Sequence, residues 1–293
     1  MRYNPKDLIR TERYQSEGFD LFKFTPETPS SNTPVVLAPG FNAGHESYGL
    51  LIQELCKNGF TVICTEYRPE AQIQPQKLGF IPDVDRVKRH AIKSAINLGT
   101  LAGGKVHFVG HSKAAIEGIP IIKKNPDKIE GCILIAPRGI LKKKNPVGAL
   151  GTLIAGEVRN SLGKRRLKKR FPELKDTLKL IKKAEKQYGK FGPKYLIEIL
   201  STVTQTIQDS FRQLQEYGVR VVVMPQQNDG YYPPEQMRKI LKEVDFPEED
   251  LLILSGIYGA LHGAVKYDPT VCQDIVEALK EIEENKHHSH FLE

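Results

Sequence analysis

Short apolar runs recur along the chain, and segments with helical periodicity separate them. The apolar runs predict buried strands at 34–38, 60–64, 105–109, 131–136, 219–224 and 251–254, and an alternating run predicts another at 20–24. The periodic segments predict helices at 48–58, 83–98, 113–123, 205–217, 234–244 and 270–284. Because continuous apolar strands alternate with helices, we expect a mostly parallel central sheet covered by helices on both faces, an α/β fold.

One long segment interrupts this alternation. Residues 138–204 contain no strand-like run and are too long for a single crossover helix. Between residues 138 and 194 the chain has 18 lysines and arginines against 4 acidic residues, whereas the whole chain has a net charge of only +8. We therefore expect residues 1–137 and 205–293 to form the core of the protein and residues 138–204 to form a basic helical cap inserted into it.

The most informative motif follows the predicted strand at 106–109. There the sequence Gly110-His111-Ser112-Lys113-Ala114 leads directly into a helix-favouring run. A strand that turns at once into a helix leaves one residue exposed at a strained corner, and small residues must lie two positions before and two after it. Ser112 is at that corner, so the motif predicts a nucleophile elbow, although Ala114 replaces the usual final glycine.

A serine nucleophile needs a base within hydrogen-bonding reach and a carboxylate that orients the base. In an open parallel sheet, functional groups gather at the carboxyl ends of strands. Asp229 follows the predicted strand at 219–224, and His262 follows the predicted strand at 251–254. Asp245 and Asp250 are the competing carboxylates, but they come after the next helix. The order Ser112, Asp229, His262 is the one this sheet topology requires.

With these motifs the chain resembles the α/β-hydrolase superfamily, from about residue 20 to residue 284. The resemblance is carried by four segments, Val35-Val36-Leu37-Ala38-Pro39-Gly40-Phe41, Gly110-His111-Ser112-Lys113-Ala114, Asn228-Asp229-Gly230-Tyr231-Tyr232-Pro233 and Leu261-His262-Gly263. It implies that Ser112 is the nucleophile, His262 the general base and then acid, and Asp229 the orienting carboxylate.

The resemblance also implies an oxyanion hole made of backbone N–H groups, because negative charge develops on the substrate oxygen during acyl transfer. One donor would be Lys113, directly after the nucleophile, and the other Phe41 in the first loop. Pro39 stands where many relatives have histidine. The lysine side chain has two interpretations, a solvated residue of the first helical turn or a cation that faces the pocket and favours anionic substrates.

Other candidate groups have structural interpretations. We expect His111 to pack or hydrogen-bond beneath the elbow and His45 to be a loop residue rather than a second base. The histidines near the C-terminus fit a flexible polar tail at 286–293 better than a metal site. Neither Cys-x-x-Cys nor a Cys/His pair at ligand spacing occurs. We therefore expect no metal, no cofactor and four small buried thiols in a reducing compartment, namely Cys56, Cys64, Cys132 and Cys272.

The basic insert has three interpretations. Residues 163–170 are densely basic, an apolar stretch at 147–156 precedes them, and apolar residues recur at helical spacing afterwards. In the first interpretation the insert is a solvated cap over the pocket, and in the second it is a surface that makes peripheral contact with an anionic membrane. Nucleic-acid binding is not expected, since aromatic residues are not interleaved with the charges.

Taken together, these features predict a serine hydrolase that cleaves a small carboxylic ester or an acyl lipid through an acyl-enzyme intermediate. The alternative is a relative with little or no catalytic activity that binds an acyl or anionic ligand, which the departures at Pro39, Lys113 and Ala114 favour. The first residues lack the apolar segment of a secretory signal, and the longest apolar run is about half of a membrane span, so we expect a cytoplasmic protein.

Overall fold

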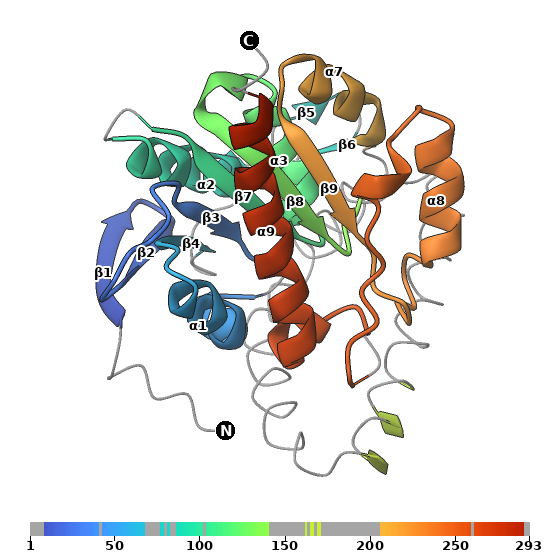
Figure 1. Cartoon of the computed structure of the whole chain (residues 1–293), viewed down its shortest axis with the longest axis horizontal. Coiled ribbons are helices and arrows are strands. Elements are labelled where there is room, and N and C mark those ends of the chain that lie inside the picture. The colour runs from blue at the N-terminus through green and yellow to red at the C-terminus, as the bar shows by residue number, and fades with distance from the viewer. Residues whose placement is uncertain are drawn as a thin grey trace.

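A seven-stranded sheet forms the centre of the computed structural model (Figure 1). The strand order is β1-β2-β4-β3-β7-β8-β9, in which β1 and β2 pair antiparallel and all strands from β4 to β9 are parallel. The strands are β1 (Ile9–Ser16), β2 (Phe19–Pro26), β3 (Val35–Ala38), β4 (Val62–Tyr67), β7 (Val106–His111), β8 (Ile129–Ile135) and β9 (Arg220–Met224). The predicted α/β fold with a mostly parallel sheet is confirmed.

The structure describes the N-terminal and C-terminal parts of the core and only a few residues of the predicted insert. The described residues are 9–40, 43–67, 77–78, 81–82, 86–101, 104–140, 162, 165–166, 169–170, 206–258 and 261–289. The boundaries of the basic cap at 138–204 therefore stay a prediction. Its first three residues are described, and Ile140 packs into the core.

Helices cover both faces of the sheet, as predicted. Helices α1 and α9 pack on one face, and α2, α3, α7 and α8 contribute to the cluster on the other (Figure 1). The bounds are α1 (Gly49–Lys57), α2 (Arg86–Gly99), α3 (Ala114–Ile122), α7 (Phe211–Glu216), α8 (Pro234–Lys242) and α9 (Pro269–Ser289). Short 3-10 turns lie at η1 (His45–Tyr48), η2 (Pro126–Lys128), η4 (Gln208–Ser210), η5 (Glu248–Asp250) and η6 (Ala264–Lys266), and a small hairpin pairs β5 (Lys77–Leu78) with β6 (Ile81–Pro82).

Two apolar clusters explain why the central strands are mostly apolar. Successive residues of a strand point to opposite faces, so Val36 belongs to the cluster beneath α2 and α3, whereas Val35 and Leu37 belong to the cluster beneath α1 and α9. All three are fully buried. A strand that is covered on both faces needs apolar residues on both. The parallel packing of β3, β7, β8 and β9 places their carboxyl ends at one edge of the sheet.

The structure differs from the sequence prediction at a predicted strand, at strand β1 and at the end of a helix. The expected strand at 251–254 forms only two isolated parallel bridges, Val223 to Leu251 and Gln226 to Leu254, because it lies at the edge of the sheet with Ile253 exposed. Strand β1 was not predicted, since its polar residues lie on an exposed edge strand. Helix α9 continues through Ser289 into the expected tail, where no glycine or proline ends it.

Three further observations bear on the predicted class of protein. The four cysteines are free and buried, and burial raises the pKa of Cys56 to about 12, so this thiol is protonated near neutral pH. Within the described residues, no cluster of three histidine, cysteine or acidic side chains could hold a metal ion. In the same part of the chain, no helix is both long and apolar enough to cross a bilayer.

Candidate active site

Ser112 lies at the corner between β7 and α3, as the motif predicts. Its backbone φ is 56°, a left-handed value that a non-glycine residue adopts only when its surroundings enforce it. Those surroundings are backbone hydrogen bonds: the Ser112 N–H donates to the Ile135 carbonyl at 2.8 Å, and the Ser112 carbonyl accepts from the Arg138 N–H at 3.0 Å. The corner is thus held by the end of the neighbouring strand β8.

Close packing of α3 on β7 explains the small residues around the elbow. A Cβ atom added to Gly110 would lie 2.7 Å from the ring of Phe108, and one added to Gly118 would lie 2.3 Å from the same ring. Ala114 is fully buried, and its carbonyl carbon lies 3.5 Å from the Cβ position of Gly110. The extra methyl group of alanine therefore fits, and the departure from the usual motif does not prevent the elbow.

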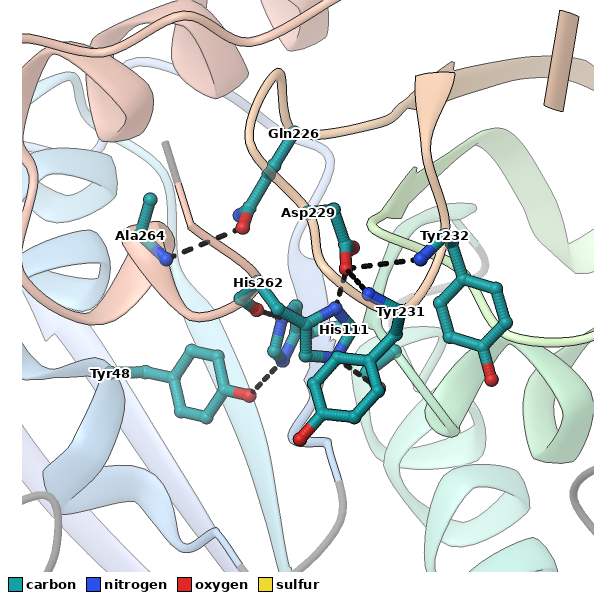
Figure 2. A network of polar contacts seen from close by, with 9 residues as sticks. Tyr48, His111, Gln226, Asp229, Tyr231, Tyr232, His262 and Ala264 are labelled. Carbon is teal, nitrogen blue, oxygen red and sulfur yellow. Dashed lines mark hydrogen bonds and ion pairs between the residues drawn. The ribbon is translucent and has the colours of Figure 1, made fainter. Parts of the chain in front are cut away.

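The three polar side chains predicted from the sequence meet in one chain of hydrogen bonds, and Figure 2 labels two of them, His262 and Asp229. The Oγ of Ser112 lies 2.9 Å from Nε2 of His262, and Nδ1 of His262 lies 2.6 Å from Oδ2 of Asp229. The other carboxylate oxygen of Asp229 accepts the backbone N–H groups of Tyr231 at 2.8 Å and Tyr232 at 3.1 Å. Ser112, Asp229 and His262 are all buried.

This geometry determines which protons can move. A carboxylate accepts hydrogen bonds only, so the contact with Asp229 keeps the proton of the imidazole on Nδ1. Nε2 is then left as an acceptor facing the hydroxyl of Ser112, which is the arrangement needed for a base that activates a serine. The edge of the Tyr231 ring packs on the imidazole, with ring centres 4.8 Å apart, and limits its rotation.

Residues 29–264 match the family model described as serine aminopeptidase, S33. This match spans the elbow, Asp229 and His262. The chain belongs to this family of α/β hydrolases. Among curated proteins, none matches the sequence.

Solved structures of similar fold include enzymes of different activities. A thermophilic esterase from Thermogutta terrifontis is 20% identical and has a TM-score of 0.60, and the match covers 92% of this chain and 99% of the esterase chain. A putative lipase from Acinetobacter baumannii is 15% identical, with 94% and 93% covered and a TM-score of 0.62. A bromoperoxidase from Bacillus anthracis is 16% identical, with 94% and 99% covered and a TM-score of 0.58. Likeness at this level shows the fold alone.

Of the two predicted oxyanion donors, the structure describes Lys113 but not Phe41. Lys113 follows Ser112 and precedes the first residue of α3, where a backbone N–H points out of the helix start. Phe41 lies outside the described residues. Its neighbour Gly40 is described, and a Cβ atom there would lie 2.7 Å from Nδ1 of His111 and 3.3 Å from Cβ of Ser112. The first loop therefore passes directly against the elbow, and only glycine fits there.

The Lys113 side chain is neither solvated nor available as a free cation. It is completely buried, and its Nζ lies 3.0 Å from Oε1 of Glu117, one helical turn further along α3. Lys88 approaches the same oxygen at 3.8 Å. The interpretation as a solvated residue is wrong, and the ion pair removes the reason to expect this charge to select anionic substrates. An adjoining cavity of about 20 Å³ beside Gly40 has room for about one water molecule.

A second chain of hydrogen bonds, which includes a residue that the sequence did not reveal, lies beneath the elbow (Figure 2). His111 donates from Nε2 to the carbonyl of His262 at 3.0 Å, and Tyr48 donates its hydroxyl proton to Nδ1 of His111 at 2.6 Å. The Gly40 N–H donates to the Tyr48 hydroxyl at 2.8 Å. The expectation that His111 hydrogen-bonds beneath the elbow is confirmed. No sequence signal distinguishes Tyr48, which joins the first loop to the His262 loop.

Removing the Tyr48 hydroxyl should destabilise the fold. In Tyr48→Phe, both Nδ1 of His111 and the Gly40 N–H lose their buried partner, so we expect the free energy of unfolding to fall by about 2–3 kcal/mol. Urea denaturation monitored by circular dichroism measures this loss. Tyr217→Phe, at a tyrosine that is 54% exposed, is the matched control and should change stability by less than about 0.5 kcal/mol. Equal stability of the two variants would contradict the buried network.

His111 should also make stability depend on pH. Burial lowers the pKa of His111 well below 6.5, and electrostatic interactions with His262, Lys266 and Arg138 lower it further. Near pH 6.5, His111 therefore becomes protonated in the unfolded chain but stays neutral in the folded chain. The contribution of this group to the free energy of unfolding should be complete above pH 6.5 and should decrease as the pH falls below it. We expect a slope of up to about 1.4 kcal/mol per pH unit from this group. Urea unfolding between pH 5 and 8 should show a smaller slope in His111→Asn.

The competing groups are engaged elsewhere. His45 hydrogen-bonds to the carboxylate of Glu66 through Nδ1 and stacks on Phe22 with ring centres 3.9 Å apart, so it is not a second base for Ser112. Asp250 pairs with Arg220 at 2.7 Å, and Asp245 is exposed. A residue missed from the sequence is Gln226, whose side-chain oxygen accepts the Ala264 N–H at 3.4 Å and ties the loop of His262 to the end of β9.

Proposed function

We propose that the chain is a serine hydrolase that cleaves carboxylic esters, with a small ester or an acyl lipid as substrate. The observation that carries the proposal is the continuous hydrogen-bond chain from Ser112 through His262 to Asp229, with contacts of 2.9 and 2.6 Å. The family is one of hydrolases, and the solved structures of similar fold include an esterase and a putative lipase, which supports this reaction class.

In the proposed reaction, Nε2 of His262 takes the proton of Ser112 while Oγ attacks the ester carbonyl carbon. The carbonyl oxygen becomes an oxyanion beside the backbone N–H groups proposed at Lys113 and Phe41. The ester C–O bond then breaks, and His262 gives its proton to the departing alcohol. Water, deprotonated by the same Nε2, attacks the acyl-enzyme, and the acid leaves as the proton returns to Ser112.

The charges around the site favour an ester over the peptide substrate suggested by the family name. An aminopeptidase must bind a free ammonium group, which calls for an unengaged carboxylate near the nucleophile. Among the described residues, Asp229 is saturated by His262 and two backbone N–H groups, and Glu117 pairs with Lys113. Arg138, which forms no ion pair with a described residue, would repel an ammonium group.

A fluorophosphonate probe tests the proposal against the alternative of a non-catalytic binding protein. Such probes react only with an activated serine, so we expect one label per chain on the peptide that contains Ser112, identified by mass spectrometry. Heat-denatured protein should remain unlabelled. If native protein is also unlabelled, Ser112 is inert and the binding alternative stands.

A further inference from the structure

Arg138 lies beside the nucleophile although the sequence motifs do not include it. It follows the carboxyl end of β8 by three residues, and its backbone N–H donates to the carbonyl of Ser112 at 3.0 Å. Two unusual backbone angles shape the turn around it, a φ of 43° at Ala136 and of 94° at Gly139. A Cβ atom at Gly139 would lie 3.0 Å from Ile116. The turn is therefore tightly packed and holds Arg138 in a defined position.

The side chain of Arg138 is a buried cation, since the residue is 8% exposed. Within the described part of the chain, its Nε has no hydrogen-bond partner. No carboxylate of the described residues lies within ion-pair distance of its guanidinium group. The guanidinium carbon lies 5.7 Å from the centre of the Tyr231 ring, which itself packs on the imidazole of His262. A buried guanidinium with an unpaired donor is costly, so its presence next to the Tyr231 ring calls for an explanation.

A second unsatisfied donor lies nearby. The hydroxyl of Tyr232 is buried and has no hydrogen-bond partner among the described residues. The centre of the Tyr232 ring lies 6.1 Å from that of His262. Burial raises the pKa of Tyr232, and the positive charge of Arg138 opposes this rise, so the two groups act on each other electrostatically. Figure 2 shows the Tyr232 ring directed away from Asp229, with its hydroxyl at the far end.

Asp229 does not satisfy these donors. Its charge interacts electrostatically with Tyr232. However, one of its oxygens accepts a hydrogen bond from His262 and the other accepts two backbone N–H groups. It can offset the charge of Arg138 at a distance without accepting its hydrogen bonds. It also disfavours a ligand with two negative charges at this place, since like charges repel strongly where water is excluded.

We propose that Arg138, assisted by the hydroxyl of Tyr232, binds a carboxylate group carried by the substrate. A guanidinium binds a carboxylate through two parallel hydrogen bonds, and a singly charged anion suits one cation next to Asp229. Resting on the proposed function, this inference assigns the substrate class as esters that carry a second, free carboxylate, such as half-esters of short dicarboxylic acids.

A matched pair of substrates tests the inference. The p-nitrophenyl half-ester of glutaric acid and p-nitrophenyl pentanoate have acyl chains of the same length and differ in the terminal carboxylate. The readout is the ratio of their kcat/KM values, with Ser112→Ala protein as the blank for spontaneous hydrolysis. We expect the wild type to prefer the half-ester by about 10- to 100-fold, the range of charge-assisted hydrogen bonds, and Arg138→Gln to bring the ratio close to one.

Two further variants separate recognition from general effects. Tyr232→Phe removes only the unsatisfied hydroxyl and should lower the ratio by about 3- to 10-fold. Arg212→Gln removes one positive charge from a side chain that is 75% exposed and should leave the ratio at the wild-type value. A wild-type ratio of one or less, or a ratio that Arg138→Gln leaves unaltered, would overturn the inference.

A binding measurement covers the case in which Arg138→Gln folds poorly or no ester is cleaved. Monomethyl glutarate, which carries one free carboxylate, should raise the unfolding temperature of Ser112→Ala protein, and of the same protein with Arg138→Lys, which keeps the charge, more than methyl pentanoate, which carries none. Turnover of both p-nitrophenyl esters at equal rates would contradict the carboxylate site but not the hydrolase. Stabilisation by monomethyl glutarate without any turnover would support the carboxylate site and count against the hydrolase. Absence of both effects would overturn both.

Discussion

Replacing Ser112 by alanine is expected to lower kcat for p-nitrophenyl esters by about 10⁶-fold, the loss seen when a serine hydrolase loses its nucleophile. The hydroxyl that His262 faces at 2.9 Å is then absent, and no described side chain can take its place in the same position. Alanine has the same Cβ atom as serine, so the strained corner at φ 56° should be retained. Stopped-flow or steady-state release of p-nitrophenol measures the change.

The matched control is Ser16→Ala, at an exposed serine that ends strand β1 on the far edge of the sheet. It should hydrolyse the same esters at the wild-type rate. Circular dichroism spectra of the two variants should coincide with that of the wild type. If Ser112→Ala retained full turnover, the assignment of this serine as the nucleophile would have to be abandoned.

The second large effect is expected at Asp229. In Asp229→Asn, the amide can keep accepting the N–H groups of Tyr231 and Tyr232 through its oxygen, so the loop should stay in place. Its NH₂ group, however, then faces Nδ1 of His262 and favours the tautomer that carries its proton on Nε2. That tautomer cannot accept the proton of Ser112, and we expect kcat to fall by about 10⁴-fold.

Asp245→Asn is the control for this substitution. Asp245 is exposed and has a φ of 54°, a conformation that asparagine tolerates as well as aspartate does. It should hydrolyse esters like the wild type, with the same pH profile. Similar losses in both variants would mean that the effect comes from charge or stability, and the orienting role of Asp229 would then be wrong.

The central strands and the order of the functional residues could be predicted because both leave local signals. Strands such as β8 and β9 are covered on two faces and are apolar along most of their length, so they stand out from the helices between them. The elbow has its own signal, since a strand that turns directly into a helix needs small residues near Ser112. Strand β1 leaves no such signal, because its side chains are mostly exposed.

The individual partners of the buried polar groups could not be predicted in the same way. Tyr48 and His111 are 63 residues apart, and Gln226 and Ala264 are 38 apart. Nothing in the local sequence links these pairs. The burial of Lys113 against Glu117 had a visible pattern, a lysine and an acidic residue four positions apart, but this spacing is equally common on solvated helix surfaces.

By itself, the sequence determined the fold class, the strained corner at Ser112 and the set of residues proposed for acyl transfer, because hydrophobic periodicity and turn geometry depend on near neighbours. Only the tertiary structure decided that His262, 150 residues from Ser112, reaches its hydroxyl, and that Arg138 is buried with no ion pair to any described residue. Charge and hydrogen bonding act through space, so their partners emerge only when the parallel strands bring their carboxyl ends to one edge.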